Sequence, residues 1–354
     1  MIVFLLLILV LMVTDMAIAP QGAYCEDYMS RDSNNVIKGV FILLIVLSHY
    51  SQYCQLDGAA DLAYWAIRLH LDQAVVSMFL FYSGYGMMES IRQKGFSYVK
   101  HIPVHRLLKV WWNFVIAVLC FLILDIVLGR FFPVKHILLA FVGYTSLGNS
   151  DWYMFAIFSL YGLTFVAFLA VCRENSRLNR LAGIALLTAL TCGAILWQMK
   201  MDRPAWAYNT MLLYPLGALF SECRPLVESL LKKGALWYSG TALLTALVYM
   251  YSYLHRQDRF LVFAVWVSAF TVAVLLLTWK VSFKSWVLRW FGENLFWVYI
   301  LQRLPMIVLD AAGMVDRHRY FCLVLVILST VLLTELFNRT VGQWNNRLFK
   351  RIEK

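Results

Sequence analysis

His49 is the residue of this sequence best suited to acid–base chemistry. It stands in the apolar run NNVIKGVFILLIVLSHYSQY, eleven residues after Lys38. Eleven residues at 3.6 per turn leave about 20° of rotation and an axial separation of about 16 Å, so both side chains share one helix face. Because imidazole titrates near neutral pH and ionisable groups inside membrane helices are costly, His49 is a candidate catalytic base. The alternative is a histidine that only hydrogen-bonds a neighbouring helix.

A basic stretch between residues 90 and 109 has the composition of a polyanion site. Arg106 and Lys109 stand at i and i+3, on one face of the helix that begins there. Arginine donates two parallel hydrogen bonds to a phosphate, and lysine supplies a single positive charge. The alternative is a charge cluster that only fixes the orientation of a membrane protein, with Trp111 and Trp112 as interface anchors.

Small residues interrupt the run FLFYSGYGMMES. Ser83, Gly84 and Gly86 allow either a thin ligand or another backbone to approach closely inside the membrane. Close packing of helices through small residues explains the pattern equally well.

Polar side chains also interrupt two later apolar segments. In GENLFWVYILQRLP, Tyr299, Gln302 and Arg303 share one helix face, and we expect them to line a cavity. In NSDWY, Asp151 and Trp152 combine a hydrogen-bonding group with an aromatic ring, as a sugar site does. Aromatic residues also gather at any membrane interface, so NSDWY is either a sugar site or a set of interface anchors.

Membrane helices must position these residues. Of the 354 residues, 62% are hydrophobic and 14% are charged, against ~45–50% and ~25% in soluble domains. This composition excludes a soluble globular enzyme. At ~20 apolar residues per crossing, it predicts an all-α, polytopic transmembrane helical bundle of about eleven spans. The predicted spans are 2–19, 36–53, 71–89, 110–128, 152–171, 181–198, 205–221, 235–254, 260–280, 290–310 and 320–338.

The distribution of basic residues predicts the orientation, because loops rich in Lys and Arg stay in the cytoplasm. With the 90–109 loop inside, 21 of the 31 basic residues lie inside and nine lie outside. This assignment of the loops to the two sides of the membrane requires that residues 131–148 form a re-entrant segment and not a twelfth crossing. The N-terminus is then outside and the C-terminus inside. Since the loops account for the net charge of +11, no nucleic-acid partner is predicted.

The N-terminal run MIVFLLLILVLMV is either an extra membrane helix or a signal peptide with Ala17–Ala19 as its cleavage site. No basic region precedes the run, which favours a retained helix. The seven cysteines form neither a CxxC motif nor a Cys/His cluster, so no disulfide framework and no metal site is predicted. The oligomeric state stays open.

The order of these motifs resembles the acyltransferase family 3 of bacterial membrane proteins. In that family a basic residue and Gly precede nine apolar positions and His, which is similar to Lys38, Gly39 and His49. The family's RxxR pair at the entrance of a later helix is similar to Arg106 and Lys109.

Three further motifs carry the same resemblance. The family's SGY or SGF helix is similar to residues 81–85, and its Trp-aromatic motif with a downstream Tyr is similar to residues 152–161. Its closing span is similar to residues 292–303, with Tyr299 aligned. The resemblance covers about residues 33 to 338.

This resemblance implies an enzyme of the bacterial inner membrane. It implies a ten-helix acyltransferase domain over 33–338, preceded by an extra helix and linker over 1–32 and followed by a short basic cytoplasmic tail over 339–354. The activity implied is transfer of an acyl group, usually acetyl, from cytoplasmic acyl-CoA to a hydroxyl of an extracytoplasmic glycan or a lipid-linked saccharide. Acyl-CoA (acetyl-CoA) is then a co-substrate, and neither a permanently bound cofactor nor a metal is expected. The lipid bilayer and the acceptor glycan are the expected partners.

The resemblance also implies roles for the candidate residues. His49 is the expected general base or transient acyl carrier, with Lys38 on the same catalytic face. Acyl-CoA is expected at Lys38, Ser83, Arg106 and Lys109, and the acceptor at Asp151, Trp152, Tyr299, Gln302 and Arg303.

The chain departs from the family pattern at four positions. Lys38 and Lys109 stand where the family often has Arg, so the charge is kept. Asn35 stands where Asp is common, and Gln302 where His is common, so neither titrates. The alternative function is a transporter or flippase for a glycan or an acylated intermediate. Transporters of this size usually contain internal repeats, and none is visible in this sequence.

Overall fold

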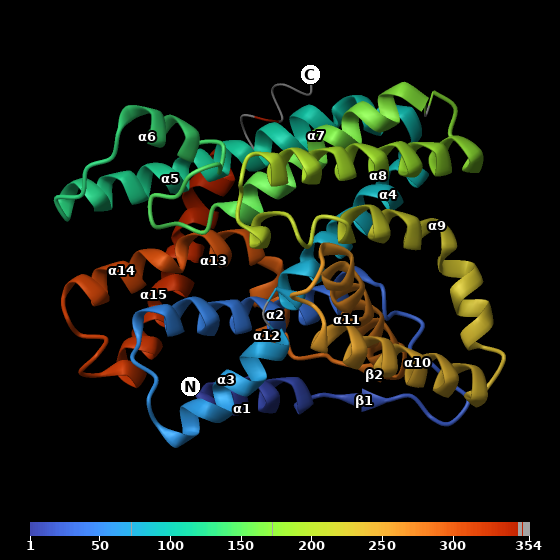
Figure 1. The fold of residues 1–354 in the computed structure, drawn as a ribbon, viewed down its shortest axis with the longest axis horizontal. Coiled ribbons are helices and arrows are strands. Elements are labelled where there is room, and N and C mark those ends of the chain that lie inside the picture. The colour runs from blue at the N-terminus through green and yellow to red at the C-terminus, as the bar shows by residue number, and fades with distance from the viewer. Residues whose placement is uncertain (72, 172, 346–348, 350–354) are drawn as a thin grey trace.

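The protein, described here from a computed structural model, is an all-helical bundle with one two-stranded sheet (Figure 1). The structure describes residues 1–345, except 72 and 172, and residue 349. The helices are α1 (Ile2–Val13), α2 (Arg31–Tyr50), α3 (Ala59–Leu71), α4 (Ala74–Ile102), α5 (Lys109–Val127), α6 (Val134–Ala140), α7 (Trp152–Val171), α8 (Arg177–Lys200), α9 (Leu213–Leu231), α10 (Ala235–Leu254), α11 (Phe260–Lys280), α12 (Trp286–Glu293), α13 (Leu295–Leu301), α14 (Arg303–Ala311) and α15 (Arg319–Phe337). Much of the predicted tail, residues 346–348 and 350–354, lies outside the described residues.

Six helical segments of the described chain are long and apolar enough to cross a membrane. They are Arg31–Tyr53, Asp61–Val127, Trp152–Val171, Arg177–Lys200, Phe260–Lys280 and Arg319–Asn345. Each of the eleven predicted spans overlaps a helix, and the span at 290–310 overlaps three consecutive helices, α12, α13 and α14. The all-helical membrane bundle is therefore confirmed, and the number of crossings stays a prediction.

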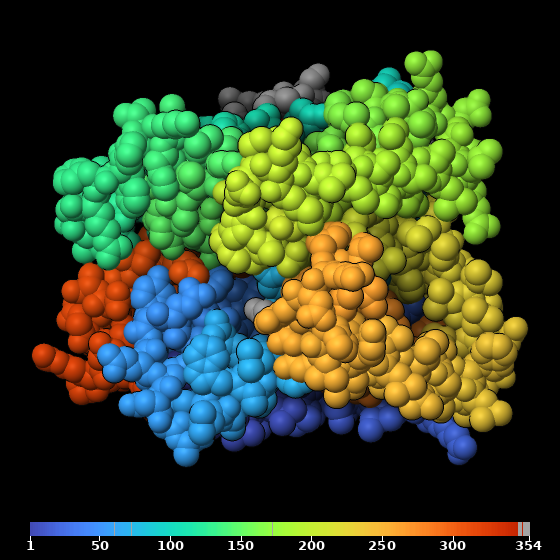
Figure 2. All heavy atoms as spheres, viewed as in Figure 1, coloured from blue at the N-terminus to red at the C-terminus, as the bar shows by residue number. Residues whose placement is uncertain are grey.

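The helices run largely along the long axis of the molecule. In Figure 1 this is plain for α2, α5, α7 and α8, with the α5–α6 and α14–α15 loops at one end and the α7–α8 and α9–α10 loops at the other. In the space-filling view the orange α11, the light-blue α3 and the yellow-green segment that joins α8 to α9 stand forward on the near face (Figure 2). Leu236, Leu243 and Leu247 of α10 are exposed, as expected for side chains that face lipid.

The helices α6 and α1 are each too short to cross a bilayer on their own. At 1.5 Å per residue α6 is about 10 Å long and α1 about 18 Å, against a hydrocarbon core of ~30 Å. The helix predicted over residues 2–19 ends at Val13, since Asp15 has a positive φ of 61°. The chain then continues through strand β1 (Ala17–Ile18), which pairs with β2 (Val281–Ser282) directly after α11.

Helix α2 is held against α12 by a reciprocal pair of glycines. A Cβ on Gly39 would collide with the carbonyl of Leu288, and a Cβ on Gly292 would collide with the carbonyl of Asn35. Small residues let the two backbones touch, which is the usual way in which membrane helices pack. The same contact fixes the position of Lys38 and, further along α2, of His49.

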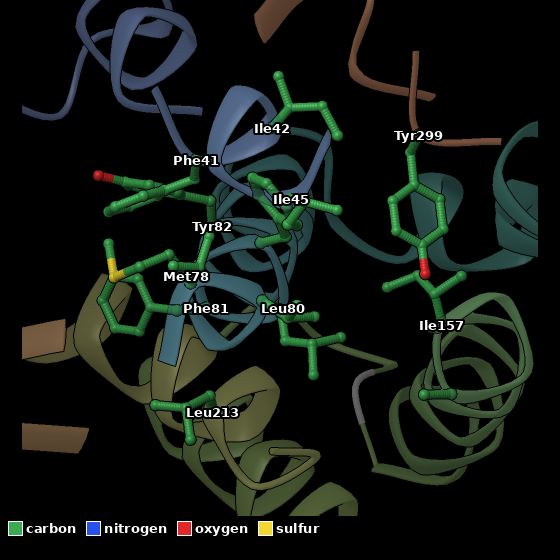
Figure 3. Close-up of a cluster of buried hydrophobic side chains, with 14 of the residues drawn as sticks. Phe41, Ile42, Ile45, Met78, Leu80, Phe81, Tyr82, Ile157, Leu213 and Tyr299 are labelled. Atoms are coloured by element: carbon green, nitrogen blue, oxygen red, sulfur yellow. The ribbon is translucent and has the colours of Figure 1, made fainter. Parts of the chain in front are cut away.

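Helices α4 and α9 pack in the same manner. A Cβ on Gly84 would collide with the Tyr214 carbonyl, and a Cβ on Gly217 with the Phe81 carbonyl. Gly84 therefore serves helix packing, whereas a Cβ on Gly86 would meet open space. The close-up in Figure 3 shows the apolar core at this junction, where residues of α2, α4 and α9 meet.

Replacing Gly39 by Ala is expected to destabilise the bundle. Overpacking of this kind costs about 1–3 kcal/mol, because the new Cβ must displace the backbone of α12. Thermal unfolding in detergent measures the loss as a lower midpoint. The matched control is Gly240→Ala in α10, where the added Cβ meets open space. Equal midpoints for the two variants would contradict the packing role of Gly39.

Candidate active site

Two cavities lie along α2. The first, which we call the Lys38 cavity, has a volume of about 330 Å³. The second, the His49 cavity, has a volume of about 560 Å³. The described residues that line one do not line the other. Because eleven residues of helix separate Lys38 from His49, the two side chains stand about 16 Å apart along α2.

His49 lies next to a serine and an arginine that come from distant parts of the chain. Its Nδ1 is 3.4 Å from Ser150 Oγ, and Arg303 Nε donates a hydrogen bond of 3.0 Å to the same Ser150 Oγ. Arg303 also donates to Tyr53 Oη at 3.3 Å and to Gln52 Oε1 at 2.8 Å. These three partners are neutral, so the positive charge of Arg303 is not neutralised by them.

Two buried polar atoms beside His49 lack a well-formed hydrogen bond among the described residues. Gln302 is fully buried, and its Nε2 donates to the Tyr299 carbonyl at 3.0 Å, while its Oε1 lies beside the His49 imidazole without a well-formed hydrogen bond. The buried Tyr299 hydroxyl lies beside Ser150, also without a well-formed hydrogen bond. An unpaired buried polar group costs free energy. These two atoms therefore mark a place where polar atoms of a ligand would bind.

Tyr299 stands at the boundary between the two cavities. It lines the Lys38 cavity, and its ring centroid is 6.2 Å from that of His49 and 5.3 Å from that of Tyr153. In Figure 3 the ring projects from α13 toward Ile157 of α7. The histidine of one cavity and the hydroxyl-bearing ring of the other are thus neighbours.

The Lys38 cavity is cationic. Lys38 Nζ lies 5.6 Å from the ring centroid of Tyr82, and Arg106 Nε donates to Tyr98 Oη at 2.7 Å. Lys38 and Arg106 are close enough to repel each other. The described lining residues include these two cations and no carboxylate, so the cavity attracts an anion.

A break in α4 brings Arg106 into this cavity. The helix kinks at Gly95, which has a φ of 65°, and a π-helical turn at Pro103–Leu108 leads into α5. Such turns shift the helix face and often occur at functional sites. Arg106 lies inside the turn and lines the cavity. Lys109, the first residue of α5, is not among the described residues that line either cavity and has contacts of its own.

Most of the other predicted site residues line one of the two cavities. Asp151 and Trp152 line the His49 cavity with Arg303. Ser83 lines the Lys38 cavity, where its Oγ is 3.0 Å from Tyr161 Oη. Asp151 precedes α7, and burial raises the pKa of its carboxyl above the ordinary value.

Sequence reasoning did not select Arg68 and Arg130, which the structure places in the His49 cavity, and it did not foresee the contacts of Ser150. Ser150 is next to Asp151 in the chain, but its contacts with His49 and Arg303 span 101 and 153 residues. The two arginines had the appearance of ordinary loop charges. No local pattern distinguishes them from the other basic residues of the loops.

Comparison with known proteins identifies the family of the chain. No curated protein and no solved structure matches the chain significantly. A family model described as an acyltransferase domain matches residues 32–339, a range that contains most of the chain and both His49 and Lys38. The resemblance seen in the motifs is thereby confirmed. The chain belongs to acyltransferase family 3.

Proposed function

We propose that the protein transfers an acyl group, acetyl in the first instance, from cytoplasmic acyl-CoA to a hydroxyl of an extracytoplasmic or lipid-linked glycan. The observation that carries this proposal is the arrangement of two cavities along α2, one cationic and lined by Tyr299, the other containing His49, whose ring centroid lies 6.2 Å from that of Tyr299. Membership of an acyltransferase family supports the reaction class. The arrangement of the two cavities supports a reaction that takes its donor from one side of the membrane and its acceptor from the other.

The donor would occupy the Lys38 cavity. Acyl-CoA carries several negative charges, and Lys38 and Arg106 supply positive charge without a carboxylate among the described lining residues. Gly86 leaves room beside them. The run of about 16 Å from Lys38 to His49 suits an extended pantetheine arm, which would bring the thioester to Tyr299.

The acceptor would occupy the His49 cavity, where Asp151, Trp152 and Arg303 offer hydrogen bonds and an aromatic face. His49 would take the proton of the acceptor hydroxyl while the oxygen bonds to the thioester carbon. The carbon–sulfur bond then breaks, and the proton leaves with the CoA thiolate. In the alternative sequence the imidazole attacks first and passes the acyl group on.

The proposed orientation places the His49 end of α2 outside a bacterial cell and the Lys38 end in the cytoplasm. The excess of basic residues in the loops predicted to lie inside supports it. The α5–α6 and α14–α15 loops lie at one end of the bundle and the α7–α8 and α9–α10 loops at the other (Figure 1). This arrangement suits alternate crossings.

Proteoliposomes test the function directly. With radiolabelled acetyl-CoA outside and a glycan extract as acceptor, we expect acceptor-dependent release of CoA together with labelled glycan. Movement of intact substrate across the membrane without release of CoA would overturn the proposal and favour a transporter.

Removing the charge of Arg106 or Lys38 is expected to weaken donor binding. Hydrogen bonds to charged groups contribute about 1.5–3 kcal/mol, so Arg106→Gln and Lys38→Gln should each raise the KM for acyl-CoA about 10- to 100-fold. Steady-state kinetics with varied acyl-CoA measures this change. Lys100→Gln is the control, because Lys100 is exposed and lies over Phe96 outside the cavity. Lys109→Gln should have a smaller effect than Arg106→Gln, and the reverse order would contradict the geometry of the donor site.

A further inference from the structure

Three arginines line the His49 cavity, and they come from three separate segments. Arg68 belongs to α3, Arg130 follows α5, and Arg303 begins α14. Arg68 Nε donates to Ser48 Oγ at 3.1 Å, and its guanidinium lies 4.6 Å from the Trp65 ring centroid. No hydrogen bond or ion pair joins any of the three arginines to a carboxylate within the described part of the chain.

The carboxylates of the cavity do not balance this charge. Asp151 and Asp310 line it. Asp151 lies in the field of Arg303 and of Arg203, a fourth arginine outside the lining, and accepts from backbone N–H groups at the start of α7. Asp310 is exposed near the end of α14. Three arginines therefore line the cavity against two carboxylates, of which one is offset by Arg303 and Arg203 and the other is solvated.

We infer that the acceptor carries an anionic group, a carboxylate or a phosphate, which Arg68 and Arg130 bind while His49 engages the hydroxyl to be acylated. Guanidinium groups bind both kinds of anion through paired hydrogen bonds. This inference rests on the proposed function, and it narrows the acceptor from glycans in general to acidic glycans.

The surroundings of His49 support this assignment of the anionic group to Arg68 and Arg130 and of the hydroxyl to His49. Arg68 and Arg303 both act on the imidazole electrostatically, so they lie on the same side of the cavity as the reacting group. Arg303 is already engaged with Ser150, Tyr53 and Gln52. Arg130 is exposed at the cavity and lies in the field of the buried Asp125 carboxyl, but no hydrogen bond joins these two side chains among the described residues. Arg68 uses only its Nε in a hydrogen bond. The terminal nitrogens of Arg68 and the guanidinium of Arg130 can therefore bind a ligand, whereas Arg303 is held in place.

Binding of simple sugars tests the inference without knowledge of the natural acceptor. The protein is placed in nanodiscs of phosphatidylcholine, and saturation-transfer NMR titrations give the Kd of glucuronate, glucose 1-phosphate and glucose. We expect at least one of the two anionic sugars to bind about tenfold more tightly than glucose. The double variant Arg68→Gln with Arg130→Gln should bind all three sugars alike. The control variant Lys135→Gln, in the first turn of α6 and outside the cavity lining, should keep the preference.

Three outcomes would overturn the inference. They are equal affinities of the wild type for all three sugars, a preference that survives in the double variant, and loss of sugar binding when phosphatidylglycerol is added to the nanodiscs. The last result would show that a lipid headgroup occupies the arginines. Acyl-CoA binding is measured on the same samples. If the wild-type protein does not bind acyl-CoA, the proposed function is refuted. If it binds acyl-CoA but shows no preference for the anionic sugars, only this inference is refuted.

Discussion

His49→Gln is expected to lower acyl transfer to the acceptor by about 10²- to 10⁴-fold, the range that a positioned acid–base group contributes. Glutamine keeps much of the size and a hydrogen-bonding end, so the contacts of α2 with α12 through Gly39 are preserved. What disappears is the nitrogen 3.4 Å from Ser150 Oγ that can accept a proton. The measurement is the initial rate of labelled acceptor formation in proteoliposomes at matched protein content.

The control for this variant is His70→Gln. His70 lies in the last turn of α3, is exposed, and stacks on Tyr253 at 4.0 Å without lining either cavity. It should retain wild-type turnover. Turnover of His49→Gln within a few-fold of the wild type would refute the catalytic role and leave His49 as a packing residue.

The same variant separates the two chemical sequences proposed for His49. If the imidazole carries the acyl group, labelled acetyl-CoA without acceptor should label the wild-type protein, and His49→Gln should remain unlabelled. If His49 is only a general base, neither protein is labelled, although the wild type still acylates its acceptor. Because an acyl-imidazole hydrolyses rapidly in acid, the added acyl mass is measured at neutral pH by native mass spectrometry directly after mixing.

The helices were predictable from the sequence because their apolar runs are long and their ends are polar. The Lys38–His49 relation was also predictable, since it depends only on the pitch of one uninterrupted helix. Residues 2–19 show the limit of this reasoning: apolar residues resume after Thr14 and Asp15, but the helix ends at Val13 and the chain then pairs as a strand with residues after α11. Hydropathy does not record that long-range pairing.

The types of residue in the site could be predicted from the sequence, but not which of these residues lie together in space. Ser150 and Arg303 meet at His49 only because α2, α14 and the segment before α7 converge. Tyr299, Gln302 and Arg303 were expected on one acceptor face. Their side chains do not share one face, because the helix is interrupted between them: α13 ends at Leu301 and α14 begins at Arg303. Tyr299 consequently lines the Lys38 cavity and Arg303 the His49 cavity, with Gln302 buried beside His49.

Because Tyr299 lines the Lys38 cavity, we propose a second role for it beside the predicted acceptor role, which stays a prediction. Acyl transfer from a thioester places negative charge on the carbonyl oxygen in the transition state, and a positioned donor must stabilise it. The Tyr299 hydroxyl is a buried donor without a well-formed hydrogen bond among the described residues, in the cavity proposed for the thioester and beside the ring of His49.

Tyr299→Phe is therefore expected to lower kcat by about 10²- to 10³-fold, as the loss of one such donor does in other acyl-transfer enzymes. The ring contacts with His49 and Tyr153 remain, so the fold and the KM for acyl-CoA should change little. Tyr251→Phe on the exposed side of α10 is the control. A rise in KM with unchanged kcat would contradict the transition-state role, because it would mean that the hydroxyl binds the ground state of the donor as tightly as the transition state.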